Sequence, residues 1–161
     1  MRATPNYPAD AQQRLGVANH LLGRTYPMVN DSRILLAVAK EIHAAAISGM
    51  SALLEQDLKA RRIPALVKDM DSRLELLEES LEQHKISAAH HKTVAQLQEL
   101  MVLHEKAPVE FSKPDRFVLC DKDYKLTSVT VDSLKKFMSG VRGFVADVEK
   151  VVSEDHARIP V

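Results

Sequence analysis

Residues 34–54 have the sequence ILLAVAKEIHAAAISGMSALL, which is apolar on nearly every side of a helix with 3.6 residues per turn. Small residues such as Ser48 and Gly49 lie among the large ones and allow neighbouring helices to approach closely. A helix that is apolar nearly all round is buried among its neighbours, so this segment is predicted to be the central helix of the fold. Its main stripe consists of Leu35, Val38, Ile42, Ala46, Met50 and Leu53.

Amphipathic segments on both sides of residues 34–54 supply the helices that would surround it. Pro27 is expected to forbid a long continuation of the first helix, because proline inside a helix removes a hydrogen bond, and residues 26–30 are expected to form a tight connection. Pro108 follows the end of the fourth helix. The expected start signals of the five helices, in chain order, are Asp10, Asn30 or Asp31, Pro64, Ser87 and Thr130.

The texture changes over residues 109–127, where short apolar and polar runs alternate as in a hairpin or an ordered loop. The predicted fold class is therefore all-α, an antiparallel bundle of about five helices with a short β-hairpin-like insert before the last helix. The whole chain, residues 1–161, is expected to form one domain, with residues 1–9 and 153–161 as loose tails.

Composition narrows the class of protein. Of 161 residues only 4% are aromatic and none is tryptophan, so the core must consist of aliphatic side chains and methionine, which suit helices. Twenty-two basic residues balance 22 acidic ones, whereas dedicated nucleic-acid binders usually carry a basic excess. The single cysteine, Cys120, cannot form an internal disulfide, which fits a reducing cytoplasm. The sequence shows neither an apolar leader nor an uninterrupted apolar run of about 20 residues, so a cytoplasmic protein that does not span a membrane is expected.

Four histidines, His84, His90, His91 and His104, cluster around the third and fourth helices and raise the question of a metal site. His90 and His104 share a stripe but are fourteen residues apart, about 21 Å along a helix axis, so they cannot share an ion without further ligands. Neither an HExxH motif nor Glu-x-x-His pairs on separate helices are present. No metal and no other cofactor is therefore expected, and histidines at the core edge are the favoured interpretation.

Arg14 and His20 lie on the first helix, about 120° apart around it and roughly 9 Å apart along it. An arginine that stabilises a phosphate beside a histidine that moves a proton is one arrangement for RNA cleavage. This pair is the candidate catalytic site of the sequence, although an arginine followed closely by a histidine is also common by chance.

Two basic groups are candidate binding residues. Lys59, Arg61 and Arg62 close the long central helix, where their charge also suits the helix dipole. Lys113 and Arg116 give the segment before the last helix a mildly basic face, and this segment also suits a simple covering loop for one end of the bundle.

Four further residues are candidate interface positions. His43 is a polar residue inside the apolar central helix, which favours either a bundle-edge hydrogen bond or a contact between two bundles. Glu75, Glu78 and Glu79 belong to an acidic face of the third helix, which is either solvated or used to bind a basic partner.

The first two helices resemble the opening of the HEPN superfamily of helical bundles. The similar residues are 11–22, the Tyr26-Pro27 connection, and the Ala-rich residues 35–46 and 50–54, about a third of the chain. The resemblance implies a four- to five-helix bundle that often dimerises and acts on RNA or nucleotides. Catalytic members are similar to one another in an Arg-x4–6-His motif on a later helix. Only Arg14 to His20 fits that spacing here, on the first helix, so the resemblance implies a non-catalytic member.

The sequence thus favours a non-catalytic binding or assembly module, homodimeric and serving an RNA- or nucleotide-related process. One alternative is a metal-independent ribonuclease that uses Arg14 and His20. The other is a protein-partner adaptor that uses the acidic third helix.

Overall fold

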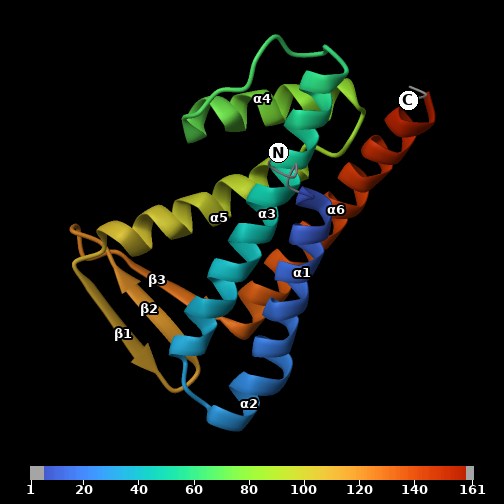
Figure 1. Ribbon diagram of the computed structural model, residues 1–161. Helices are drawn as coiled ribbons and strands as arrows, with labels where there is room; N and C mark the ends of the chain where they lie inside the picture. Colours follow the sequence, from blue (N-terminus) through green and yellow to red (C-terminus); the bar gives the residue numbers. More distant parts are fainter. Residues whose placement is uncertain (1–5, 159–161) are drawn as a thin grey trace, which may run out of the picture.

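The computed structural model of this protein describes residues 6–158 (Figure 1). Its helical elements are α1 (Tyr7–His20), a π-helical turn η1 (Leu21–Thr25), α2 (Tyr26–Val29), α3 (Arg33–Lys59), α4 (Met70–Gln83), α5 (Ala89–Lys106) and α6 (Val131–Arg158). Between α5 and α6 lie the strands β1 (Val109–Lys113), β2 (Arg116–Cys120) and β3 (Leu126–Thr130). The chain is mostly helical with a small β insert before its last helix, which confirms that part of the predicted fold class.

Helix α3 is the core helix of the fold. It contacts α1, α4, α5, α6 and the sheet, and α1 and α6 run alongside it in Figure 1. Buried side chains point from nearly all of its faces, as the sequence predicts; among those with no exposed surface are Leu35, Val38, Ile42, Ala45, Met50 and Leu53.

Gly49 allows α3 and α6 to pack closely. A Cβ atom at this position would lie 3.0 Å from Cε2 of Phe144 and 3.5 Å from Cγ2 of Val145. Both neighbours are buried in the core, so neither can move away without displacing other side chains. A side chain at this position would force the ring of Phe144 to shift by a few tenths of an ångström where these two long helices meet.

We expect Gly49→Ala to lower the free energy of unfolding by about 1 to 2 kcal/mol, because overpacking outweighs the better helix propensity of alanine. Gly16→Ala is the matched control, since a Cβ at Gly16 of α1 meets no atom within 4 Å. This control should raise the free energy of unfolding by about 1 kcal/mol. Urea unfolding of both variants measures the difference, and equal stabilisation by the two substitutions would contradict the close approach.

The first helix begins earlier than the sequence predicts. The side chain of Asn6 accepts a hydrogen bond of 3.2 Å from the amide of Ala9, and Pro8 lies in the first turn, so Asn6 rather than Asp10 caps α1. Asp10 instead accepts a hydrogen bond from the hydroxyl of Ser48 on α3. Residues 7–9, for which a loose tail was expected, are helical, and residues 1–5 lie outside the described part of the chain.

Pro27 limits the first helix as expected, since the helical run ends three residues after it, but the expectation that residues 26–30 form a tight connection is wrong. The chain stays helical through η1 into α2, and the amide of Tyr26 donates to the carbonyl of Leu21, five residues earlier. This widened turn accommodates a proline that has no amide hydrogen to donate. The helical run ends at Asn30, whose φ of 54° is left-handed.

The expectation that the next helix starts at Pro64 is also wrong, because α4 starts at Met70. The side chain of Asp69 accepts a hydrogen bond of 3.0 Å from the amide of Ser72 and so caps the helix. Residues 60–69 form an irregular connection instead, in which Arg61 has a φ of 60°.

The insert before α6 is a three-stranded antiparallel sheet in the order β1-β2-β3, one strand more than the hairpin that the sequence predicts. Phe117 and Leu119 of β2 and Val129 of β3 are buried against the core. The amide of Ser133 donates to the hydroxyl oxygen of Thr130 at 3.1 Å, which confirms Thr130 as the cap of the last helix.

The last helix continues to Arg158, into the segment for which a loose tail was expected. Val151 and Asp155 are buried on its inner side, so the helix still has packing partners in its last turns. Residues 159–161 lie outside the described part of the chain.

Among the described residues, α3 is the one helix that is long and apolar enough to cross a bilayer by length and composition. The sequence predicted no such segment, because Lys40 and Glu41 interrupt its apolar run. In this fold 56% of its most apolar 18-residue window is buried inside the molecule, and core helices of this kind pass the same test.

Candidate protein-binding groove

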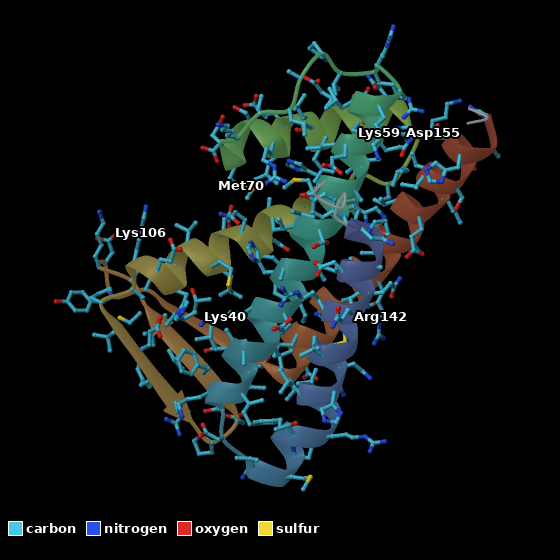
Figure 2. All side chains as sticks on the ribbon, viewed as in Figure 1. Lys40, Lys59, Met70, Lys106, Arg142 and Asp155 are labelled. Atoms are coloured by element: carbon cyan, nitrogen blue, oxygen red, sulfur yellow. The ribbon has the colours of Figure 1, made fainter. Side chains whose placement is uncertain are left out.

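A groove of about 700 Å³ lies between α4 and α5. The two helices diverge from the turn that joins them, and Figure 2 labels Met70 and Lys106 near its open end. The loop between β2 and β3 borders the groove near Lys106. The residues that line the groove come from three segments: the start of α4 (Asp69, Met70, Asp71 and Leu74), α5 with its C-cap (Ala95, Gln98, Glu99, Val102, Leu103, Lys106 and Ala107) and the β2–β3 loop (Asp121, Lys122 and Asp123).

The groove exists because α4 uses only half of its apolar stripe in the core. Leu77 and Leu81, in the second half of the helix, are buried. Met70 and Leu74 continue the same stripe at helical spacing, but they are only partly buried, because this half of α4 extends beyond its neighbours. Leu74 of α4 and the partly buried Val102 of α5 therefore both line the groove, whose surface is mostly apolar.

The rim of the groove is acidic. Five carboxylates line it, against two lysines. One of them, Asp69, accepts hydrogen bonds from Ser72, and this bonding holds the pKa of its carboxyl below the ordinary value, so the group is charged at neutral pH. The carboxylates come from the start of α4, from α5 and from the β2–β3 loop: Asp69, Asp71, Glu99, Asp121 and Asp123.

One polar side chain lies between the apolar residues of the groove on α5. The side-chain oxygen of Gln98 lies 2.7 Å from Nε2 of His43, which reaches it from α3. With its oxygen occupied in this way, the amide of Gln98 still has hydrogens to donate to a bound molecule. His43, a candidate interface residue of the sequence, therefore lies behind the groove and orients one of its lining residues.

A buried polar network holds the other half of α4 in place. Asp57, at the end of α3, has no exposed surface. Its carboxylate accepts hydrogen bonds from Arg62 at 2.9 Å and from the hydroxyl of Ser80 on α4, and it lies 2.8 Å from Nε2 of His84. Three donors surround one buried carboxylate, so its charge is compensated and α4 is fixed against α3.

The same network extends to α6 through Asp155. This carboxylate accepts hydrogen bonds from Arg62 at 2.5 Å and from Gln56 at 2.9 Å. Burial alone would raise the pKa of Asp155, but the hydrogen bonds from Arg62 and Gln56 outweigh burial and hold the pKa below its ordinary value. The hydrogen bond to Asp155 raises the pKa of Arg62 most, and the bond to Asp57 adds to this effect. Together they outweigh desolvation, which would lower this pKa.

We expect Asp57→Asn to lower the free energy of unfolding by about 2 to 3 kcal/mol, because Arg62, Ser80 and His84 lose their shared anionic acceptor while Arg62 keeps its bond to Asp155. The control is Asp115→Asn in the exposed pair with Arg116, which should change stability by less than about 0.5 kcal/mol. Urea unfolding measures both values. A loss below about 1 kcal/mol for Asp57→Asn would mean that the network does not fix α4.

The candidate catalytic pair stays on the surface. Arg14 and His20 are both exposed on α1. The guanidinium of Arg14 lies 3.4 Å from Glu41 and 3.7 Å from Asp10, so two carboxylates already compensate its charge. Cleavage of RNA by this pair stays a prediction.

The candidate basic residues separate into different places. Lys59 and Arg61 are exposed, whereas Arg62 turns inward to Asp57 and Asp155 and is not part of a surface patch. Lys113 and Arg116 are cross-strand partners on either side of the β1–β2 turn, and both are exposed, so the structure brings these two together as the sequence suggested.

The acidic residues Glu75, Glu78 and Glu79 are exposed on α4 and do not line the groove. Three of the four clustered histidines lie beside carboxylates: His84 beside Asp57, His90 beside Asp147 at 2.8 Å and His104 beside Glu110 at 2.6 Å. Within residues 6–158, no group of three or more histidine, cysteine, aspartate or glutamate side chains is arranged to hold a metal ion.

Sequence reasoning missed both the groove and the buried network. A signal for the groove was present, since the apolar stripe of α4 includes Met70 and Leu74 next to an acidic start. A signal for the network was Asp57, a carboxylate in the last turns of a helix that is otherwise buried. The sequence does not show what Asp57 bonds to, because Ser80, His84 and Asp155 lie far from it along the chain. It also does not show which helix lies opposite Met70 and Leu74.

Comparisons with protein family models, with curated proteins and with solved structures gave no match to this chain. The resemblance of the first two helices to HEPN bundles therefore stays a prediction. What the groove binds must follow from its own shape and chemistry.

Proposed function

We propose that this chain is a non-catalytic binding module that holds a segment of a protein partner in the groove between α4 and α5. The proposal rests on the groove itself, which has a volume of about 700 Å³, a largely apolar lining and a charged rim. Such surfaces are the usual places where proteins bind ligands, since they bury much of what they hold. A groove between two helices is also a common site for short segments of other proteins.

The chemistry of the groove favours binding over catalysis. Among the described residues, those that line it include no serine, threonine, cysteine, tyrosine or histidine. The side chains that most resemble a catalytic cluster, Asp57 with His84 and Ser80, are bonded to one another and lie away from the groove. In that cluster the serine donates to the carboxylate rather than to the histidine, so it is not activated as a nucleophile.

The charge of the groove favours a protein over RNA, because its carboxylates would repel phosphates. The protein is thus proposed to act as an adaptor that binds its partner in the groove, rather than on the outer face of α4. The protein can also form a homodimer in this proposal, in which case the bound segment would belong to a third chain, the partner protein.

The test compares two valine-to-aspartate substitutions. Val102→Asp places a charge on the apolar surface of the groove, and Val17→Asp places the same charge on the exposed side of α1, where the valine is 41% exposed. Tagged wild-type protein and both variants are incubated with native extract, and the retained proteins are quantified by mass spectrometry. Circular dichroism checks that both variants fold.

We expect a partner that the wild type and Val17→Asp retain equally and that Val102→Asp retains about tenfold less, because an ionised carboxylate resists burial against apolar atoms. Equal retention by Val102→Asp, or retention of no protein by the wild type, would contradict the proposed function.

A further inference from the structure

Building on the proposed binding role, we infer that the ligand of the groove is a basic amphipathic α-helix. Its apolar face would pack on Leu74, Val102 and Leu103, and its lysine or arginine side chains would pair with the acidic rim. The inference follows from the shape of the groove, from the backbone groups of its walls and from its charge.

The shape fits a helix. The lining residues of α5 recur at helical spacing from Ala95 to Ala107, so one face of α5 stays open over about 18 Å. A helix of about 12 residues has the same length. Its side chains at positions i, i+3, i+4 and i+7 would then lie along the groove, as in other complexes in which a groove binds a helix.

The backbone of the walls also favours a helix over an extended segment. The walls are mainly helices, whose backbone groups bond to one another and offer no free strand edge. An extended ligand would bury its own amide and carbonyl groups against apolar side chains without partners, which is unfavourable. A helical ligand satisfies these groups internally.

The charge of the groove selects a basic ligand. Five carboxylates and two lysines line it, and further carboxylates lie on the exposed side of α4 nearby, including Glu75 and Glu79. Lysine or arginine on the flanks of a docked helix would face this rim, whereas glutamate would be repelled. Because most of these carboxylates are exposed, their attraction should weaken with added salt.

The experiment uses a fluorescent peptide of about 14 residues, with leucine at positions i, i+3, i+4 and i+7 and lysine on the flanks. Two matched peptides accompany it: one with every lysine replaced by glutamate, and one with the same composition in a scrambled, non-amphipathic order. Fluorescence anisotropy measures binding to the full chain at low and high salt.

Two double variants locate the site. Glu99→Lys with Asp123→Lys reverses two rim charges, and Glu75→Lys with Glu79→Lys makes the same change on α4 outside the groove. We expect the lysine peptide to bind most tightly, and the rim variant to weaken it about tenfold or more. The outer variant should weaken it about threefold or less, since its charges act from farther away through solvent.

Equal binding of the glutamate peptide would overturn the charge preference, and equal binding of the scrambled peptide would overturn the docked helix. A larger effect of the outer variant would place the site elsewhere. If no peptide binds while Val102→Asp still loses a partner from native extract, the helical ligand is wrong and the binding role stands. If both experiments fail, the proposed function fails with it.

Discussion

Helix α3 is apolar on almost every side, and this requirement for burial organises the rest of the molecule. A helix of 27 residues with this pattern needs neighbours over nearly all its faces, because its apolar side chains are unfavourable in water. Helices α1 and α6 cover two of them, α5 and the sheet cover others, and α4 lies against its C-terminal half. Close packing depends on small residues, and at Gly49 an added Cβ would lie 3.0 Å from the ring of Phe144.

A second requirement arises at the end of the same helix. Asp57 is fully buried, and an isolated charge in that place would be strongly unfavourable. Ser80, His84 and Arg62 surround it, and Arg62 also bonds to Asp155 of α6. Because these groups come from three helices and the connection after α3, satisfying one carboxylate fixes the second half of α4. Its first half is tied to α3 by the hydrogen bond that Arg73 donates to the hydroxyl of Ser51 at 2.7 Å, while Met70 and Leu74 stay only partly buried, and the groove opens beside them.

Sequence patterns predict the helices whose position depends on local periodicity and capping. They do not predict features that depend on contacts between residues far apart in the chain. The burial of α3, the stripe of α6 and the cap at Thr130 follow from periodicity and capping alone. Two starts were misplaced because Asp10 and Pro64 also suit the start of a helix, whereas the caps in the structure are Asn6 and Asp69. Strand β1 was missed because it is short, mostly exposed and flanked by Pro108 and Pro114, and its pairing with β2 becomes visible only in the fold.

The candidate site was the least predictable part. The groove depends on the angle between α4 and α5, which follows from packing over the whole core rather than from either helix. Arg62 shows the same limit, because its sequence neighbours suggest a surface patch while its partners Asp57 and Asp155 draw it inward. Lys113 and Arg116, by contrast, are close in sequence, and a turn between two strands was enough to bring them together.

The most direct test of the central claim is a map of where a basic amphipathic helix contacts the protein. Amide chemical shifts of the isotopically labelled chain would be recorded while the unlabelled lysine peptide is added. The account predicts shifts concentrated on the first half of α4, on α5 from Ala95 to Ala107 and on the β2–β3 loop. Shifts concentrated on α1, on the β1–β2 turn or on the outer face of α4 would contradict it.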